Sequence, residues 1–288
     1  MITKAIYTFC SNGKSIKDNS FHWLNPKSHL IGWVHSVFSV RPLFKTLALY
    51  TDSVGKNILI DILNLPFDEV HIIFDDEPRL DNSLFAIPKM ITYSIQTEPF
   101  IHIDADIFIN GPNVLTEELL SSDILTQSIE DINRYYAFYD NAVSQFLDSE
   151  ILETPDWFKN RKEVTHAYCY GLFGGNNVSK ITECFSEILK VIKPGTFDAI
   201  PDGNLKDSLN ICYEQYMATV FLEKDNSKIK TLMSTVNLMD QEDEATEIGF
   251  CHLFGSGKKS VDTCNTLERC VMASKPDHHK KIEEFISS

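Results

Sequence analysis

The sequence predicts an α/β fold built as one domain, with a mixed, mainly parallel sheet flanked by helices. Two observations lead to this expectation. Short apolar runs alternate with helical segments through about the first 110 residues, which is the order of repeated βαβ units. Polar residues stand where these apolar runs end, and ligands of such sheets lie beyond the carboxyl ends of the strands.

The first half contains four strand-like runs, rich in branched or aromatic residues and separated by segments with helical spacing. The expected strands are Lys4–Cys10, Thr46–Tyr50, Val70–Phe74 and Phe100–Ile109, and the expected helices are Trp33–Val40, Ile58–Leu65 and Pro88–Ile95. Near the strand ends stand Thr8, Asp52, Asp75, Asp104 and Asp106. A ligand site is therefore expected at this edge of the sheet.

The second half is less regular. Strands are expected at Asp123–Gln127 and Ala167–Phe173, and amphipathic helices at Val178–Ile192 and Leu209–Leu222. Asn133–Phe146 is aromatic-rich and mixed, and loops are expected at Glu153–Glu163, Pro194–Asn204 and Gln241–Glu247, with an exposed charged end at Asp277–Ser288. The chain shows no internal repeat and no linker, which favours one compact domain over residues 1–288.

The composition excludes several classes of protein. With 288 residues, 43% of them hydrophobic, the chain resembles an ordinary globular protein. A formal net charge of −15 argues against nucleic acid and anionic membranes as partners. Seven scattered cysteines predict free thiols in a reducing compartment. Neither a transmembrane segment nor a signal peptide is recognisable, so we expect a cytoplasmic protein.

The most informative stretch is Phe100-Ile-His-Ile-Asp-Ala-Asp-Ile-Phe-Ile109, in which two aspartates interrupt an apolar run. Burying two carboxylates together is unfavourable unless a positive charge neutralises them. In a continuous strand Asp104 and Asp106 point to the same face and can reach one divalent ion, with the small Ala105 leaving room for a ligand. A turn in which the aspartates cap backbone amides is the alternative.

A second motif lies near the C-terminus, in Gly249-Phe-Cys-His-Leu-Phe-Gly-Ser-Gly-Lys-Lys259. Gly255 and Gly257 let backbone amides approach a phosphate, Lys258 supplies positive charge, and His252 can complete a metal's ligand set. The segment is not a P-loop, because histidine replaces its first glycine and lysine its final Ser or Thr. A hydrogen-bonded core histidine is the alternative for His252.

Three further groups are candidates for binding a substrate. Tyr170 and Gly171 lead into Gly174-Gly-Asn-Asn177, whose backbone and amide groups suit sugar hydroxyls, although an N-cap explains Asn177 equally well. Glu214 and Gln215 lie on a helix and can face a reacting sugar carbon or an acceptor hydroxyl, or simply face solvent. Lys89, which precedes the aspartate run, can contact a phosphate or stay solvated.

These residues resemble the GT-A class of nucleotide-sugar glycosyltransferases, which carry an Asp-x-Asp motif. His252-Leu-Phe-Gly-Ser-Gly-Lys258 looks like the late motif of the glycogenin and lipopolysaccharide galactosyltransferase family, and Gly171-Leu-Phe-Gly-Gly-Asn176 looks like the donor-sugar segment of the blood-group transferases. Both are retaining families. The chain also resembles a bacterial branch of this class. The resemblance covers most of residues 4–260.

The resemblance implies a metal-dependent hexosyltransferase. Mn²⁺, or Mg²⁺, would bind at Asp104, Asp106 and His252, and the metal and Lys258 would stabilise the leaving UDP. Thr8 and Asp52 would hold the uridine, while Tyr170, Gly171, Glu214 and Gln215 would line the sugar of the UDP-sugar donor. Residues to about 110 would form the nucleotide-binding half, about 111–270 the donor-sugar and acceptor half, and 271–288 a tail. The acceptor is an unidentified glycan, protein or lipid, and residues 130–165 are expected to select it.

Three other functions share parts of this pattern. Phosphatases of the haloacid-dehalogenase type place their aspartates after the first strand, whereas three strand-like runs precede the pair here. Sugar-1-phosphate nucleotidyltransferases need a glycine-rich basic loop after the first strand, and Ser11-Asn-Gly-Lys14 fits it poorly. A catalytically inactive glycan-binding protein would not require Asp104, Asp106 and His252 together.

Overall fold

A computed structural model of the chain describes residues 1–78, 80, 84–132, 138–148, 152–159, 164–198, 200, 204–224 and 227–288. Its strands are β1 (Lys4–Thr8), β2 (Thr46–Thr51), β3 (Glu69–Ile72), β4 (Phe100–Ile103), β5 (Ile107–Ile109), β6 (Ile124–Asp131), β7 (His166–Gly175), β8 (Ile229–Thr231) and β9 (Phe250–His252). The main sheet has seven strands in the order β3-β2-β1-β4-β7-β6-β8, and β5 pairs with β9 in a second sheet.

The described strand pairings confirm the predicted α/β class and its mixed, mainly parallel sheet. β1 pairs in parallel with β2, β2 with β3, and β6 with β8, whereas β6 and β7 are antiparallel. The α-helices are α1 (Pro26–Val40), α2 (Ser53–Lys56), α3 (Ala86–Ser94), α4 (Glu117–Leu120), α5 (Phe138–Asp148), α6 (Asp156–Lys159), α7 (Val178–Leu189), α8 (Asn204–Ile211), α9 (Ala218–Glu223), α10 (Leu238–Ile248), α11 (Val261–Ser274) and α12 (Pro276–Ser287).

Contacts divide the chain into two compact units, which we name after a strand in each. The β1 unit comprises residues 3–75, 103–114 and 246–288, and the β7 unit comprises residues 1–2, 76–102 and 115–245. The predicted division near residues 110 and 270 stays a prediction.

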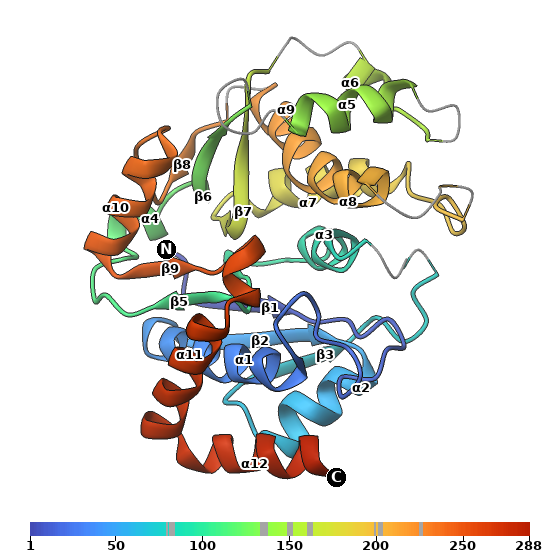
Figure 1. Cartoon of the computed structure of the whole chain (residues 1–288). Helices are drawn as coiled ribbons and strands as arrows, with labels where there is room; N and C mark the ends of the chain where they lie inside the picture. Colours follow the sequence, from blue (N-terminus) through green and yellow to red (C-terminus); the bar gives the residue numbers. More distant parts are fainter. Residues whose placement is uncertain are drawn as a thin grey trace. The chain divides into compact units, whose positions relative to one another are not determined.

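The β1 unit combines the first three strands with helices from both ends of its sequence. Helices α11 and α12 pack against α1, and α1 also contacts β5 (Figure 1). Helix α1 begins at Pro26, seven residues before the predicted start, because Asn25 caps it by accepting from Ser28 N and Pro26 suits the first helical position. The side chains of Tyr7 and Trp33 are fully buried in this core.

The β7 unit surrounds two antiparallel strands with helices. Helix α3 packs against α7, and α7 packs against α9 (Figure 1). The predicted apolar face of α7 is confirmed, because Ile181, Cys184, Phe185, Ile188 and Leu189 are all buried. The predicted helix Leu209–Leu222 is present as α8, the π-helical turn η3 (Cys212–Met217) and α9. A π turn inside a helix shifts the side chains that follow it and often marks a functional position.

Several sequence-based expectations are wrong. The expected continuous strand Phe100–Ile109 is broken into β4 and β5 by a turn at residues 104–106. The expected acidic loop Gln241–Glu247 lies in helix α10, and the expected loop Glu153–Glu163 contains helix α6. Strands β8 and β9 lack a counterpart among the predicted elements, because a three-residue strand is too short for a periodic pattern. Helix α11 lacks a counterpart as well.

Several predicted segments lie partly outside the described residues. The parts outside are residues 133–137, 149–151 and 160–163 of the segment 130–165, which includes Asn133–Phe146 and Glu153–Glu163, and residues 199 and 201–203 of Pro194–Asn204. Among the helices in the described ranges, none combines the length and the apolar character needed to cross a membrane.

Candidate functional site

The two aspartates lie in the turn between β4 and β5. Ile107 N donates to Asp104 O at 3.0 Å, which closes the turn around Ala105. The alternation expected of a strand therefore does not orient the two carboxylates; the turn does. β5 is buried at all three of its residues, so the apolar run after the aspartates anchors the turn rather than continuing β4.

Strand β9 brings the late histidine to this turn. Its antiparallel register pairs Ile107 with His252, and Leu253 N donates to Asp106 O at 2.9 Å. Two glycines permit the close approach at the other end of the pair. Gly249 has φ +78°, and a Cβ on Gly111 would lie 1.8 Å from Ile248 O.

The resulting group of side chains, Asp104, Asp106, His252 and Lys258, is called here the Asp–His–Lys cluster. Asp104, Asp106 and His252 each offer one ligand atom, and these atoms lie within 4.8 Å of one another. His252 Nε2 is 3.3 Å from Asp106 Oδ1, and Lys258 Nζ is 2.7 Å from Asp106 Oδ2. All four residues belong to the β1 unit. The structure thus brings together the three predicted metal ligands and the predicted phosphate lysine.

Asp106 is the centre of this cluster electrostatically as well. Its burial would raise the pKa of the carboxyl, but the neighbouring His252 and Lys258 outweigh burial and hold the pKa well below its usual range. The carboxylate is therefore ionised at neutral pH. Its Oδ1 atom is buried and accepts no hydrogen bond from the described residues. An ionised, buried oxygen beside a second carboxylate and an imidazole is a donor set that fits Mn²⁺ or Mg²⁺.

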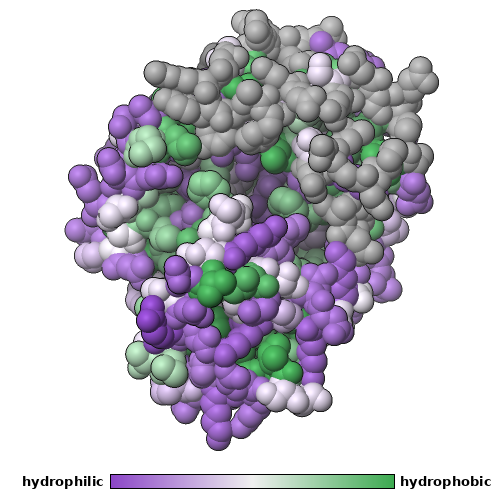
Figure 2. Space-filling model, viewed as in Figure 1, coloured by the Kyte–Doolittle hydropathy of each residue, from purple (hydrophilic) through white to green (hydrophobic). Residues whose placement is uncertain are grey.

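The short helix η4 (Gly255–Lys259) carries the lysine of the cluster. Gly255, with φ +58°, starts it, and Gly257 N donates to Phe254 O at 3.2 Å. Lys259 is exposed, whereas Lys258 is half-buried against Asp106. Phe254 is 57% exposed, its ring lies 5.5 Å from that of His252, and Figure 2 shows a hydrophobic patch where Figure 1 draws the segment after β9.

A second acidic group in the β1 unit is explained by an ion-pair network. Glu268, His279 and Glu283 also lie close enough together to hold a metal. Lys27 Nζ, however, lies 2.6 Å from Glu268 Oε1 and contacts Glu283 as well, and His279 Nε2 is 2.9 Å from Glu268. These pairs tie α1, α11 and α12 together, which is a structural role.

The predicted uridine residues stand at the ends of β1 and β2. Thr8 is the last residue of β1 and is half-buried. Asp52 caps helix α2 by accepting from Gly55 N at 2.7 Å, and it also accepts from Ser11 N and Ser11 Oγ at 2.6 Å each. Both carboxylate oxygens of Asp52 therefore hold the loop after β1 and the start of α2.

The remaining predicted residues belong to the β7 unit and surround a buried ion pair. Lys89 Nζ on α3 lies 2.7 Å from Glu214 Oε1 on η3, and the two side chains are 11% and 3% exposed. Tyr93 donates to the same carboxylate at 3.2 Å, and its hydroxyl is also 3.2 Å from His102 Nδ1. We call these four residues the Lys–Glu core. Burial, and then the charge of Lys89, lower the pKa of His102 well below its usual value.

Gln215, Tyr170 and Gly171 lie beside the Lys–Glu core. Gln215 is half-buried, and its Oε1 accepts a hydrogen bond from the hydroxyl of Tyr139, which also contacts Glu130. Tyr170 and Gly171 are buried within β7, and the Tyr170 ring stacks on Phe173 at 4.1 Å. Tyr93, His102, Tyr139 and Glu130 are polar core residues that the sequence does not distinguish from ordinary strand and helix positions.

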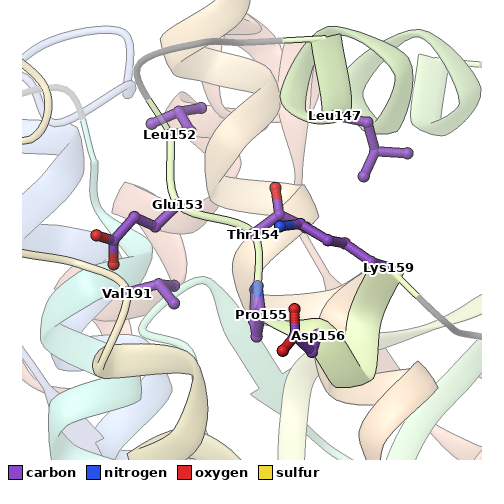
Figure 3. A pocket seen from close by; sticks show the side chains of 8 residues that line it. All are labelled: Leu147, Leu152, Glu153, Thr154, Pro155, Asp156, Lys159 and Val191. Atoms are coloured by element: carbon purple, nitrogen blue, oxygen red, sulfur yellow. The ribbon is translucent and has the colours of Figure 1, made fainter.

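One pocket in the β7 unit has a volume of about 550 Å³. Figure 3 shows the side chains that line it: Leu147, Leu152, Glu153, Thr154, Pro155, Asp156, Lys159 and Val191. Seven of these eight lie in the segment 130–165 that is expected to select the acceptor. The lining combines aliphatic side chains with acidic, basic and hydroxyl groups.

Sequence reasoning missed His29, which is buried on α1 and interacts electrostatically with Lys258 and Asp106. A signal was available, because Asn25-Pro26 is the pattern of a helix start. A helix beginning there places His29 and Trp33 one turn apart on the same face.

A comparison with models of protein families shows the family of this chain. A family of unknown function, DUF6734, matches residues 3–285, which is nearly the whole chain. The chain belongs to DUF6734. A search of curated proteins finds no match for this DUF6734 member.

Three solved structures are similar to this DUF6734 chain. Mouse xyloside xylosyltransferase 1 is 10% identical with a TM-score of 0.44, covering 91% of this chain and 100% of that one. The inositol-1-phosphate CTP transferase of T. maritima is 10% identical with a TM-score of 0.41, covering 94% and 96%. The galactosyltransferase LgtC, in complex with donor and acceptor sugar analogues, is 11% identical with a TM-score of 0.43, covering 99% and 96%. Because these similarities are weak, we argue function from the residues of the site.

Proposed function

We propose that this DUF6734 chain is a metal-dependent glycosyltransferase that moves a hexose from a UDP-sugar to an acceptor with retention of configuration. The observation that carries the proposal is the Asp–His–Lys cluster. Two carboxylates and an imidazole converge at one turn, and a lysine shares the central carboxylate. A donor set for a hard cation together with a lysine suits a metal-bound diphosphate.

Asp104, Asp106 and His252 would hold Mn²⁺ or Mg²⁺, with Asp106 and His252 as direct ligands. The metal, when bound, neutralises negative charge on the leaving UDP as a Lewis acid. Lys258, which lies beside Asp106, adds a second positive charge on the same side of the diphosphate. The amides of Gly255 and Gly257 and the space beside Ala105 would accommodate the diphosphate. Leu253 N, which donates to Asp106 O, holds the turn in place for this task.

Thr8 and Asp52 are proposed at the uridine, with Asp52 acting by shaping the loop after β1. Tyr170, Gly171, Glu214 and Gln215 are proposed at the donor sugar. Gln215 is the better candidate for direct contact, because it is half-buried whereas Glu214 is buried and paired with Lys89. Lys89 would then act through Glu214 and not as a free phosphate ligand.

We propose that the acceptor, a glycan, protein or lipid, binds at the pocket shown in Figure 3, whose mixed lining suits a polar molecule with an apolar part. All seven cysteines of the chain are free thiols. Free thiols suit a reducing compartment, so we propose that the protein acts in the cytoplasm.

Release of UDP from a panel of UDP-hexoses, with water as the surrogate acceptor, tests the proposal. We expect Mn²⁺-dependent UDP release with one UDP-hexose, lost in EDTA. NMR spectra taken before mutarotation should show the α anomer of the released hexose from an α-linked donor. Sugar 1-phosphates with nucleoside triphosphates and a generic phosphomonoester form the two comparison arms. Turnover only in a comparison arm, or full UDP release in EDTA, would contradict the metal-dependent transferase. An inverted product would contradict retention alone.

A further inference from the structure

His29 is a buried histidine with one ring nitrogen that meets no acceptor. The residue is 5% exposed, and its Nε2 lies 3.0 Å from Trp33 Nε1. An indole N–H can only donate, so Nε2 must accept and cannot carry a proton. The proton of the neutral ring is therefore on Nδ1. Within the described ranges no group accepts a hydrogen bond from Nδ1.

The ring is held neutral in this tautomer. Burial, and then the charge of Lys258, lower the pKa of His29 to about 3 against the opposing charge of Asp106. Protonation would also place a second N–H against the indole N–H of Trp33. At neutral pH His29 therefore offers one fixed donor, Nδ1–H, and Trp33 determines which nitrogen carries it.

His29 is also held in position by its surroundings. Its ring stacks on Phe21 at 4.8 Å and lies 5.9 Å from the ring of Phe9. The chain leading into α1 is tied to the lysine of the Asp–His–Lys cluster, because Leu24 N donates to Lys258 O at 2.9 Å. The contact with Trp33 engages the Nε2 edge of the ring, which leaves the Nδ1 edge for another partner.

A buried donor without an acceptor is unfavourable, so folded proteins rarely retain one without a partner in their working state. Two features indicate the kind of partner. It must be an acceptor, because Nδ1 carries the proton. The charge of Lys258, which acts on His29 more strongly than the opposing charge of Asp106, favours an anion. A phosphate oxygen meets both conditions, and a bound diphosphate at the neighbouring cluster would supply one.

We propose that Nδ1–H of His29 donates a hydrogen bond to a diphosphate oxygen of the nucleotide, and that Trp33 positions this donor by fixing the tautomer. The inference rests on the proposed function, since the cluster must bind the diphosphate. It adds to that function a neutral donor from α1, beside the charged groups from the turn and η4. A neutral donor strengthens binding without repelling the metal.

Calorimetric titration of UDP in the presence of Mg²⁺ tests this assignment. We expect His29→Phe, which keeps a ring of similar size, to weaken UDP binding about ten- to hundredfold, the effect of a hydrogen bond to a charged group. His29→Gln, which retains an amide donor, should lose less. Trp33→Phe should lose about as much as His29→Gln, because the ring stays but both tautomers become available.

His278→Phe is the matched control. The Nε2 atom of His278 on α12 is also buried and has no hydrogen-bond partner among the described residues, and its ring packs on Phe38. The charges that act on it are those of Lys281, Lys275 and Asp277, and not those of the Asp–His–Lys cluster. UDP affinity should be unchanged in this variant. If wild type binds UDP and His29→Phe binds it equally well, the assignment of His29 is wrong and the proposed function stands.

Nitrogen NMR of the histidine rings provides a second test, which uses the wild-type protein and so does not depend on whether a variant folds. We expect one ring with the proton on Nδ1 from pH 5 to 9, and a downfield shift of that proton on adding Mg²⁺ and UDP. An Nδ1 proton that UDP binding does not shift would overturn the assignment. Failure of wild type to bind UDP with any divalent metal would overturn the proposed function, and the role of His29 with it.

Discussion

Two lysine–carboxylate ion pairs of this chain have the same nitrogen–oxygen distance but different surroundings. Lys258 and Asp106 in the β1 unit, and Lys89 and Glu214 in the β7 unit, each approach to 2.7 Å. Asp106 has a second carboxylate, Asp104, and an imidazole beside it and lies in a turn. Glu214 is buried in a π-helical turn and accepts from Tyr93 instead.

The comparison shows that the neighbours of an ion pair, rather than its length, decide what it can do. Around Glu214 a lysine and a tyrosine both donate to the carboxylate, which makes the Lys–Glu core a structural element. Around Asp106 the neighbours include two further groups that could bind a metal, and one carboxylate oxygen receives no hydrogen bond from the residues that the structure describes. We therefore propose that the Asp–His–Lys cluster binds the metal and the diphosphate, and that the Lys–Glu core supports the fold and thereby the proposed donor-sugar residues around Gln215.

The largest effect is expected from removing the carboxylates of the turn. Asp104→Asn and Asp106→Asn should each lower UDP-sugar turnover by at least about a hundredfold, because the metal loses an anionic ligand and the leaving group its stabilisation. Their circular dichroism spectra should match wild type. Asp61→Asn, which breaks the exposed pair with Lys56, is the control and should turn over normally. Normal turnover in either turn variant would remove the functional distinction between the two pairs.

The next effect is on stability and should appear in the other pair. Lys89→Met leaves the Glu214 carboxylate buried without its lysine, and we expect a loss of about 3–5 kcal/mol in the free energy of unfolding. Lys258→Met should lose less, because Lys258 is 18% exposed against 11% for Lys89 and Asp106 keeps His252. Urea unfolding measures both.

In nucleotide binding the larger loss should come from Lys258→Met and the smaller from Lys89→Met, the reverse of their order in stability. Lys258→Met should weaken UDP binding about tenfold or more, since a charge-assisted hydrogen bond to phosphate is lost. Loss of stability in Lys258→Met equal to that of Lys89→Met would show that both lysines serve the fold.

Removal of metal should affect the Asp–His–Lys cluster and the Lys–Glu core differently, and this test needs no mutation. EDTA should abolish UDP release, and an excess of Mn²⁺ should restore it. The urea midpoint of the chain without nucleotide should change little in EDTA, because protein contacts alone hold the Lys–Glu core together. Irreversible loss of activity after metal is returned would indicate that the ion holds the fold together.

The smallest effect concerns a pair of intermediate burial, His166 and Glu223, whose side chains are 30% and 31% exposed. Burial raises the pKa of Glu223, but hydrogen bonds from His166 and Tyr168 outweigh it, so the pKa lies below its usual value of 4.5. A lowered carboxyl pKa stabilises the folded state above pH 4.5, and this stabilisation is lost as the pH falls below that value.

Melting temperatures of wild type and Glu223→Gln between pH 3 and 7 test this expectation. Wild type should be more stable above about pH 5, and the two curves should converge at lower pH. A difference that grows as the pH falls would show that the sign is wrong.

The sequence predicted the sheet class and most long elements because their apolar spacing is regular. It failed at the aspartates themselves, where apolar residues on both sides suggested one continuous strand. The pairing of β5 with β9 decides that point, and this pairing joins segments about 140 residues apart that no local pattern connects. Nevertheless, Asp104, Asp106, His252 and Lys258 were all predicted, because buried acids and a late glycine-rich lysine segment are unusual on their own.

The roles of Lys89, Glu214 and His29 could not be predicted from the sequence, and the reason is physical. Lys89 and Glu214 were proposed as separate ligand contacts, and only folding shows that they neutralise each other. The donor nitrogen of His29 depends on Trp33 one turn later and on a helix start at Pro26 that the apolar pattern does not mark. Such roles depend on which polar groups already have hydrogen-bond partners, and only the folded structure shows this.

The most direct test of the central claim is calorimetric titration of UDP into the wild-type chain, once with Mn²⁺ and once with EDTA. We expect binding at one site per chain with Mn²⁺, and affinity at least about tenfold weaker in EDTA, because Asp104, Asp106 and His252 contact UDP through the ion. Equal affinity in both titrations, or no binding in either, would contradict the assignment of the Asp–His–Lys cluster as a metal–diphosphate site.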